Sequence, residues 1–343
     1  MRNISWLPSL LARMKGRKIV VIGDLILDEY LRGSAERISP EAPIPVVRIQ
    51  SRTYRPGGAA NVGANLHALG GVPLLVGVIG RDSAGTQFLQ VLEDNHIYTR
   101  FVLQANDARP TTLKTRVVAN NQQVVRTDIE TREPLSPKSR DGLLDGFKEA
   151  VTRADAVVIS DYDKGVLAGD SLGQILAIVE KRGVPCFVDP KGGAIKLFPR
   201  VSLIKAGHAE AERMSGIEIK TDRDAEMVGQ GILEMNQCQY VLLTRGAEGM
   251  SIIQRKKAPL HIPSLAREVY DVTGAGDTAM ATVALAMSAG ASVLEAAVLA
   301  NAAASVVVGK VGTATVNPGE LLERRESIPW PKQLQRVVAK APT

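Results

Sequence analysis

Asp271-Val272-Thr273-Gly274-Ala275-Gly276-Asp277 is the stretch on which the fold assignment depends, and the small-residue segment 278–282 follows it directly. Two glycines and an alanine keep bulky side chains away from the point where a helix is predicted to begin. The unpaired N–H groups of a helix start favour negative charge, above all phosphate. Asp277 lies just inside this predicted helix, where a carboxylate can accept a proton from an attacking hydroxyl group. The motif therefore suggests phosphoryl transfer.

Other interpretations of the motif stay open at this point. Asp at a helix start is commonly only a cap, and the segment from Gly274 to Ala279 also fits the loose dinucleotide-binding fingerprint of an oxidoreductase. Its place near the C-terminus, without a clear βαβ unit after it, argues against the oxidoreductase. A P-loop is not supported, because Gly309-Lys310 is followed by Val311 and not by Ser or Thr.

Composition narrows the class of protein. The 343 residues are 45% hydrophobic, 23% charged and only 4% aromatic, as in parallel sheets covered by helices. The net charge of +6 is modest and carries no basic run with aromatics, which favours an anionic small substrate over nucleic acid. No apolar run is long enough to span a membrane and no secretion signal is visible, so we expect a cytoplasmic protein. Cys186 and Cys238 are expected to be buried, reduced and without a disulfide.

The first predicted strand, Lys18 to Asp24, is a β-branched run that ends in Gly-Asp. Ligands bind at the carboxyl ends of strands in open α/β sheets, so Asp24 and Asp28 are candidates to bind a polyhydroxylated substrate. One of the two could equally form a turn. A second glycine motif, 57–65, opens a small-residue helix on which Asn61 and Asn65 share one face.

Residues 30–55 and 111–128 are predicted to form an accessory sheet that acts as a lid. Prolines at 40, 43 and 45 exclude a helix, and the alternation after Pro45 suggests short edge strands. Asn120-Asn121 is predicted to be the turn of a hairpin. An exposed edge of this sheet could be covered by a second subunit, so we expect a homodimer.

Helices are predicted over 84–94, 136–152, 170–182, 277–289 and 293–308, with strands between them. Polar clusters follow the strands that end near Ser160, Val188 and Thr244. Lys164 and Lys191 in two of these clusters could position an anionic group, although such lysines are more often solvated surface residues.

The glycine motifs at 57–61 and 271–277, in this order and at this separation, resemble the ribokinase-like carbohydrate kinases, also called the phosphofructokinase B family. The resemblance covers about residues 16–320. It implies an α/β fold with three α/β/α layers, a mostly parallel central sheet and a small β lid. Residues 1–320 would form the kinase domain and 321–343 a peripheral tail.

Five further segments are similar to the heptose phosphate kinases of that family: 37–43, 120–123, 160–165, 301–304 and 308–313. This similarity implies ATP-dependent phosphorylation of C1 of D-glycero-β-D-manno-heptose 7-phosphate, in lipopolysaccharide core synthesis. In many bacteria such a kinase is fused to an adenylyltransferase. Another sugar or nucleoside kinase of the same fold is the alternative, as is a sugar-binding or regulatory protein that has lost its chemistry.

The resemblance also assigns roles residue by residue. Asp277 would be the base, and the amides of Gly274, Ala275 and Gly276 the anion hole. ATP would be the phosphoryl donor with Mg²⁺, held through water by Glu210, and K⁺ would bind near Asp271. The sugar would meet Asp24, Asp28, Gly57, Gly58, Asn61, Asn65 and Arg116, with Lys164, Asp189 and Lys191 nearby. The nucleotide side would comprise Gly207, His208, Glu210, Thr244, Arg245, Gly246, Gly249 and Asn301.

One position departs from the family pattern. The family usually has Asn-x-x-Glu where this chain has Gly207-His208-Ala209-Glu210. Glycine cannot hydrogen-bond through a side chain, so part of the metal or phosphate network would be weakened or supplied by water or His208. We expect lowered activity and not its loss.

Overall fold

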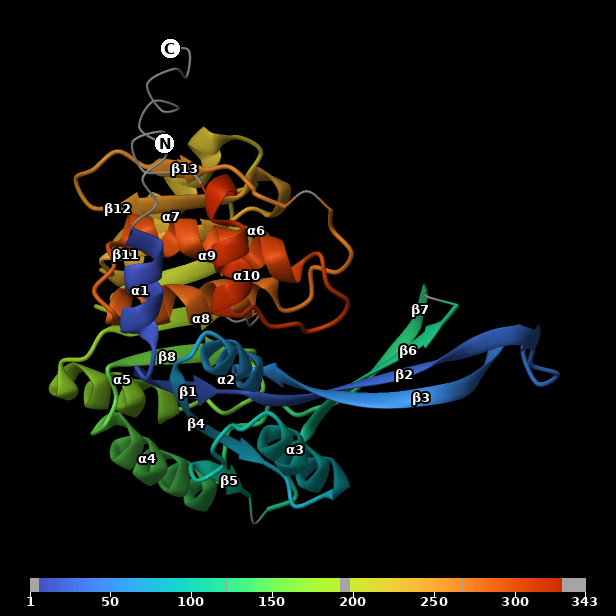
Figure 1. The fold of residues 1–343 in the computed structure, drawn as a ribbon. Helices are drawn as coiled ribbons and strands as arrows, with labels where there is room; N and C mark the ends of the chain where they lie inside the picture. Colours follow the sequence, from blue (N-terminus) through green and yellow to red (C-terminus); the bar gives the residue numbers. More distant parts are fainter. Residues whose placement is uncertain (1–5, 106, 121, 192–197, 267, 329–343) are drawn as a thin grey trace.

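The computed structural model describes residues 6–105, 107–120, 122–191, 198–266 and 268–328. Within these residues the central sheet has nine strands in the order β13-β12-β11-β10-β9-β8-β1-β4-β5 (Figure 1). Neighbouring strands pair in parallel from β5 to β11, and β12 and β13 are antiparallel to their neighbours. The strands are β1 (Lys18–Gly23), β4 (Val72–Ile79), β5 (Val102–Gln104), β8 (Ala156–Asp161), β9 (Cys186–Pro190), β10 (Leu203–Gly207), β11 (Tyr240–Thr244), β12 (Met250–Gln254) and β13 (Leu260–Ile262).

Helices cover both faces of this sheet, which gives three layers. Along β1, Ile19 and Val21 join one buried core while Val20 and Ile22 join the other, as the alternation of side chains along a strand requires. The first core is completed by helices α1 (Trp6–Met14), α2 (Ala59–Ala68), α3 (Ser83–Asp94), α8 (Ala275–Ser288), α9 (Val293–Val307) and α10 (Pro318–Glu323). The second is completed by α4 (Pro137–Val151), α5 (Ser171–Arg182), α6 (His208–Ser215) and α7 (Asp222–Asn236).

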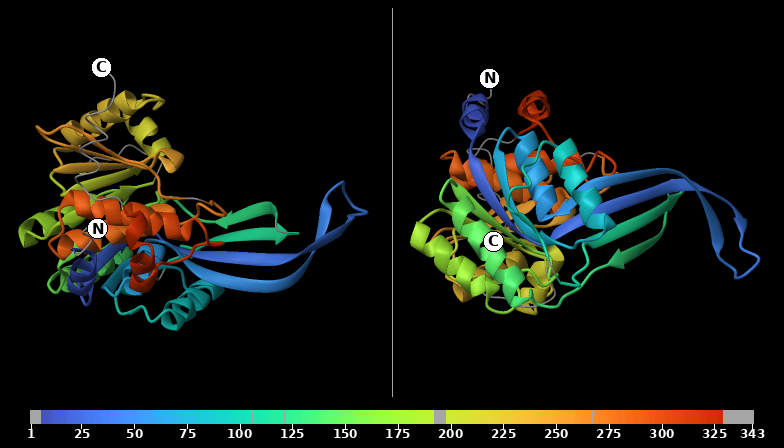
Figure 2. Two further views of the ribbon diagram at one scale, coloured as in Figure 1. Left: turned by 45° about the horizontal axis from the view of Figure 1, so that its top comes forward. Right: turned by 90° about the horizontal axis from the view of Figure 1, so that it is seen from below.

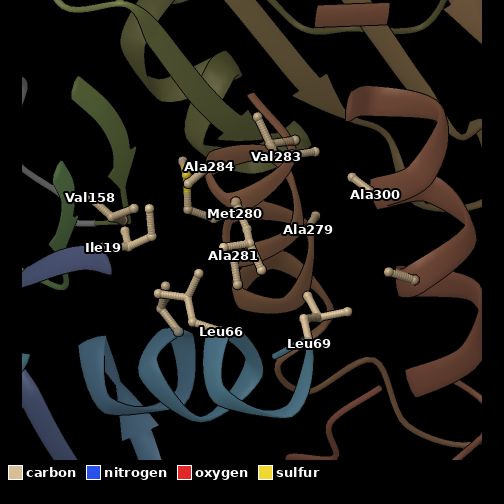
Figure 3. Close-up of a cluster of buried hydrophobic side chains, with 14 of the residues drawn as sticks. Ile19, Leu66, Leu69, Val158, Ala279, Met280, Ala281, Val283, Ala284 and Ala300 are labelled. Carbon is tan, nitrogen blue, oxygen red and sulfur yellow. The ribbon is translucent and has the colours of Figure 1, made fainter. Parts of the chain in front are cut away.

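Helix α8 is buried on all sides, which explains its small residues. Met280 and Ala281 lie between the strand residue Val158 and the side chain of Leu66 on α2, and Ala300 on α9 approaches from another side (Figure 3). Alanines let three helices approach the sheet and one another closely, because tight packing leaves no room for longer side chains. The start of α8 is thereby held rigidly against the ends of the central strands.

The second sheet is a ribbon that projects away from the three layers (Figures 1 and 2). Its order is β3-β2-β6-β7, with two antiparallel hairpins joined by the parallel pair β2 and β6. The strands are β2 (Leu25–Ile38), β3 (Pro45–Gly58), β6 (Thr112–Ala119) and β7 (Gln122–Ile129). The hairpin predicted at 111–128 is confirmed, and Asn120 has a positive φ of 51° at its turn. Asn121 lies outside the described residues.

The prediction of short strands after Pro45 was wrong. Strands β2 and β3 have 14 residues each and run from Leu25 to Gly58, beyond the predicted 30–55. Pro45 is the first residue of β3, and Pro40 and Pro43 lie in the connection, so none of them interrupts the ladder. The register shifts once between Arg32 and Gly33 and again further along, and such bulges let a long ribbon twist.

The predicted helices are present with small shifts of their ends. The predicted tail is not peripheral at its start, because Leu321 is fully buried and Ile328 is 3% exposed, both in the core beneath α8 and α9. Cys186 and Cys238 are buried and free, as expected, and burial raises the pKa of the Cys186 thiol to about 12. In the described ranges, no helix combines the length and apolar character needed to cross a bilayer.

Candidate active site

Two central strands, β9 and β10, each carry a charged residue directly beside the start of α8. Phe187 of β9 and Leu203 of β10 point into the core beneath α8. Because side chains alternate along a strand, Asp189 and Lys205, two residues further on, face the same side. Their side chains are 1% and 2% exposed, and Lys205 Nζ lies 2.9 Å from Asp189 Oδ1. A buried ion pair therefore lies beside the helix start.

The start of α8 is held open by glycine. Gly274 has a left-handed φ of 83°, and a Cβ there would lie 2.8 Å from Asn61 Nδ2. The amide of Ala275 already donates to the carbonyl of Val272 at 3.2 Å. The following amides, of Gly276 and Asp277, have no partner within the helix. We therefore expect an anion to bind these two amides and not that of Ala275.

Asp277, the predicted base, is 3% exposed. Its Oδ1 accepts hydrogen bonds from Lys191 Nζ at 2.6 Å and from the Tyr162 hydroxyl at 2.9 Å, and its Oδ2 accepts one from Asn61 Nδ2 at 2.7 Å. Burial acts to raise the pKa of Asp277, but the Lys191 ammonium and these hydrogen bonds lower it below its ordinary value. The Asp277 carboxylate is therefore charged, and its role as the base stays a prediction.

Asn65 supports this arrangement from behind. Its Nδ2 donates to the backbone carbonyl of Asn61 at 2.9 Å, and its Oδ1 accepts from the Thr278 hydroxyl at 2.8 Å. Asn65 is completely buried. The chain Thr278, Asn65, Asn61 and Asp277 thus joins α2 to α8, and Asn65 fixes Asn61 without facing the sugar itself.

Asp28 lies at the base of the lid. Its Oδ1 accepts from Arg116 Nη1 at 2.6 Å, and the guanidinium carbon lies 5.2 Å from the centre of the Tyr30 ring. Burial raises the pKa of Asp28, although the Arg116 charge acts to lower it. Gly57 lies on β3 opposite Ile26, and a Cβ there would collide with the Asp28 carboxylate. Glycine at 57 therefore leaves room for this buried carboxylate.

Of the two acids Asp24 and Asp28, Asp24 is the one that stabilises a turn. Its carboxylate accepts from the amides of Tyr162 at 2.8 Å, Lys164 at 3.2 Å and Val166 at 3.3 Å. Burial and the charge of Asp161 raise the pKa of Asp24 to about 6. It holds the loop after β8, and its carbonyl accepts the first amide of α2, next to Gly58. Of the two acids, Asp28 therefore stays the predicted substrate ligand.

Cations gather where the lid meets the body. Lys164 Nζ pairs with Glu130 Oε1 at 2.7 Å, and Lys114 Nζ, on β6, pairs with Asp128 at 2.6 Å and with Glu130 at 3.2 Å. Lys164 is buried and not a solvated surface residue. Lys114 and Lys164 lie on the same side of the lid as Arg116. We call these three side chains the basic wall.

A pocket of about 470 Å³ lies on the other side of the helix start. It contains the predicted nucleotide residues Gly246 and Gly249, and Asn301 lines it while donating to the Pro263 carbonyl at 2.7 Å. Apolar side chains form most of its wall, as expected for a purine site. Its lining also includes Ala247, Met250, Ser264, Ala266, Val269, Val272, Ala275, Ala304, Ser305 and Val308.

Arg245 does not line this pocket. Its side chain is 4% exposed and its Nη1 donates to Asp222 at 2.5 Å and to Ser251 at 3.2 Å. The Ser251 hydroxyl is in turn 2.8 Å from His261 Nδ1. The prediction that the Arg245 side chain binds the nucleotide is therefore not supported. The buried guanidinium is instead paired with Asp222 and Ser251 and stabilises the structure around the end of β11, because a buried charge needs a partner.

Gly207 is the N-cap of α6, and the register pairs it with Thr244 at the end of β11. A Cβ at 207 would collide with the carboxylate of Glu210, which therefore occupies the place of the missing side chain. His208 is exposed and pairs with Glu212 at 3.2 Å, away from this point. His208 thus does not replace the missing Asn.

The residues fit Mg²⁺ only together with substrate. In the part of the chain that the structure describes, no group of three or more His, Cys, Asp or Glu side chains could hold a metal. Mg²⁺ usually binds through one or two carboxylates, substrate phosphates and water. Glu210 provides such a carboxylate, so its assignment stays a prediction.

Asp271 closes the loop before α8. Its Oδ1 accepts from the Thr273 amide and its Oδ2 from the Gly312 amide, both at 2.9 Å. Burial acts to raise the pKa of Asp271, but these bonds lower it. A charged carboxylate between two loops is compatible with a K⁺ ligand, which also stays a prediction.

Three residues of the site were not predicted: Tyr162, Thr278 and Lys205. Tyr162 follows a strand that already carried the signal of a polar cluster, and Thr278 directly follows the motif. Lys205 carried no signal, because its neighbours Ile204 and Ala206 are those of an ordinary buried strand. Only the tertiary position of Gly276, at the start of α8, beside Lys205 Nζ makes Lys205 a site residue.

A larger cavity, of about 640 Å³, lies elsewhere, among α5 and the loops before β9 and β10. Its lining includes Leu176, Val184 and Pro199, with Glu180 and Arg200 paired at 3.1 Å on its edge. It brings together no base and no anion hole. Volume alone therefore does not identify the active site.

The fold and site define a sugar kinase. The model of the family described as "pfkB family carbohydrate kinase" matches residues 17–319, and the chain belongs to this family. It is 41% identical over 314 residues to the "Bifunctional protein HldE" of Geobacter sulfurreducens, covering 92% of this chain and 64% of the relative. It is 42% identical over 306 residues to the protein of that name from Edwardsiella ictaluri, covering 89% and 62%. The chain thus spans less than two thirds of these relatives.

Solved structures show the same fold. The structure of Arabidopsis thaliana ribokinase complexed with ribose and ATP has a TM-score of 0.71 at 22% identity, covering 91% of this chain and 99% of that one. Phosphofructokinase-2 from Escherichia coli in complex with potassium has a TM-score of 0.75 at 20% identity, covering 92% and 99%. The ribokinase-like α/β/α architecture is therefore confirmed.

Proposed function

We propose that this protein transfers the γ-phosphoryl group of ATP to the C1 hydroxyl of D-glycero-β-D-manno-heptose 7-phosphate. The main observation behind this proposal is that Asp277 lies between a group of polar side chains and a mostly apolar pocket. Asn61 and Asp28 lie on its sugar side, and the pocket lined by Val272 and Ala275 lies on its nucleotide side. The similarity to the bifunctional HldE proteins supports the heptose as acceptor and a place in lipopolysaccharide core synthesis.

In the proposed reaction, Asp277 Oδ1 accepts the proton of the C1 hydroxyl. The C1 oxygen bonds to the γ-phosphorus while the bond from that phosphorus to the β,γ-bridging oxygen breaks, and ADP leaves with the electron pair. The amides of Gly276 and Asp277 stabilise the negative charge on the transferring group. Lys191 and Tyr162, which occupy Oδ1 now, must give way to the sugar hydroxyl. Magnesium, when bound with ATP, neutralises phosphate charge.

The basic wall supports a phosphorylated acceptor. Arg116, Lys114 and Lys164 place three cations near the sugar side, and each is paired with at least one acid. A neutral sugar needs hydrogen-bonding groups but no such charge, whereas a phosphate ester gains charge-assisted bonds. A 7-phosphate bound at this wall would place C1 toward Asp277.

The test is a coupled assay of ADP release with candidate acceptors, followed by ³¹P and ¹³C NMR of the product. We expect turnover with the heptose 7-phosphate, and phosphorus at C1, with much lower kcat/KM for fructose 6-phosphate, ribose and adenosine. A higher kcat/KM with one of these three would contradict the heptose phosphate as the acceptor but not the kinase activity. NAD binding without ATP binding would contradict the kinase.

A binding or regulatory protein is the other candidate, favoured by Gly207. The absence of a side chain there removes one hydrogen-bonding group from the side of Glu210. Such a protein would bind the heptose phosphate but release no ADP in the same assay. The intact carboxylate and helix start favour the enzyme.

A further inference from the structure

Lys205 is a lysine in a place built for an apolar side chain. It is in the middle of β10, 2% exposed, and shares a face with Leu203, which packs in the core beneath α8. Taking an ammonium group out of water is costly unless it is paired. An apolar residue would be the ordinary solution at this position, so the charge calls for an explanation.

Pairing with Asp189 explains only part of it. Lys205 Nζ is 2.9 Å from Asp189 Oδ1, but a pair of this kind is often no more stabilising than two packed apolar residues. Lys191 already lies 3.6 Å from the other oxygen of Asp189. The acid thus has two cations, and a purely structural pair would need one.

The position of Nζ relative to α8 is the decisive observation. The point where Gly276 would carry a Cβ lies 3.0 Å from Lys205 Nζ and 3.2 Å from Lys191 Nζ. Gly276 provides one of the free amides of the helix start. Two ammonium groups and the positive end of the helix therefore meet at one residue, and all three favour the same ligand charge.

The acids present balance these cations only while no phosphate is bound. Asp189 and Asp277 carry one negative charge each, against one positive charge on Lys191 and on Lys205. In the proposed reaction Asp277 gains a proton and loses its charge, while the transferring group brings negative charge to Gly276. The cations then have the phosphoryl group as their partner.

We propose that Lys205 binds the transferring phosphoryl group through Nζ, beside the amide of Gly276, and so acts as a fixed cation of the phosphoryl-transfer site. The inference rests on the proposed kinase reaction but not on the identity of the sugar. The side chain lies two residues before Gly207, so it supplies charge on the side of the site where that glycine supplies no side chain.

The test compares Lys205→Met with the wild-type chain in binding ADP and the non-hydrolysable analogue AMP-PNP, each with Mg²⁺, by calorimetry. We expect the Kd of ADP to stay within about twofold, and the Kd of AMP-PNP to rise about tenfold or more, because only AMP-PNP has the γ-phosphoryl group. Lys205→Arg should keep most of the preference. Lys148→Met, which removes a lysine paired with Asp145 on the surface of α4, is the matched control and should change neither Kd.

Removal of Lys205 leaves Asp189 short of one partner, so the double variant Lys205→Met with Asp189→Asn is measured beside it, and thermal unfolding monitors the fold. An unchanged ratio of the two Kd values in a folded Lys205→Met or double variant would overturn the inference and leave the kinase intact. A wild-type chain that binds neither nucleotide would contradict the proposed function itself. Loss of ADP and AMP-PNP affinity to the same degree would show a structural role only, and also overturns the inference.

Discussion

Asn61 Nδ2 lies 2.7 Å from Asp277 Oδ2, although the two residues are 216 positions apart in the chain. This bond joins the two glycine motifs, since Asn61 belongs to the helix that follows Gly58 and Asp277 to the helix that follows Gly274. The Asn61 amide holds Oδ2, whereas Oδ1 accepts from Lys191 Nζ and from the Tyr162 hydroxyl. In the proposed reaction these two donors give way to the sugar hydroxyl at Oδ1.

Asp277→Asn should abolish the proton transfer while keeping the shape of the site. We expect kcat to fall by about 10² to 10⁴, the usual contribution of a general base, with little change in the Kd of the sugar. Stopped assays and calorimetry with the heptose phosphate measure both. Asp170→Asn, at an exposed acid before α5 that makes no cap bond, is the control. Turnover that survives in Asp277→Asn would show that another group is the base.

Asn65→Ala should disturb the site without touching substrate. It leaves the Thr278 hydroxyl and the Asn61 carbonyl without their partner, at a cost of about 1–3 kcal/mol in the free energy of unfolding. Because Asn61 loses its support, kcat should fall as well. Asn236→Ala is the matched control, since Asn236 is equally buried and bonds the Phe198 amide far from α8. It should lower the stability and leave kcat unchanged. Equal kcat values for the two variants would contradict the positioning role.

The pKa of about 6 for Asp24 predicts a pH dependence of stability. Between the ordinary pKa of 3.8 and about 6, the folded state binds this proton more tightly than the unfolded state. The free energy of unfolding therefore falls as pH rises through this window, by about 3 kcal/mol for this group, and the contribution is constant above it. Urea unfolding of wild type and Asp24→Asn between pH 4 and 7 should show a difference that shifts in favour of the variant as pH rises. A difference independent of pH would refute the raised pKa.

Gly207→Asn should increase turnover if the glycine weakens the phosphate or metal network. The new Cβ collides with the Glu210 carboxylate, which must rotate away and become available to Mg²⁺ or water. The measurement is kcat as a function of Mg²⁺ concentration. Gly207→Ala, which moves Glu210 without adding an amide, separates the two effects. No change in turnover or Mg²⁺ dependence for Gly207→Asn would sink the prediction.

We expect the lid to be the contact of a homodimer. Val125 and Ile129 of β7 share one face and are 47% and 54% exposed, so together they offer apolar surface to a second subunit. Val125→Asp should shift the protein from dimer to monomer in light scattering. Met227→Asp, at an equally exposed position on α7, should not. A wild-type chain that is monomeric at high concentration would contradict the prediction.

Much of the fold could be predicted because local patterns carry it. The run from Lys18 to Asp24 predicted a buried parallel strand, and the Ala-rich segment 277–289 predicted a helix. The length of β2 and β3 could not be predicted, since most of their side chains beyond Leu31 are exposed and show no regular alternation. The burial of Leu321 could not be predicted, because it depends on contacts with a distant part of the chain that the local sequence does not reveal.

The candidate site divides in the same way. The sequence by itself determined that a carboxylate and the amides of a helix start lie together at 274–277, because they come from consecutive residues. Only the tertiary structure decided that Asp24 holds the loop after β8 while Asp28 pairs with Arg116, and that Lys205 lies against Gly276. These roles depend on which strands pack against which helix. Such packing brings together residues that are separated by many positions in the chain.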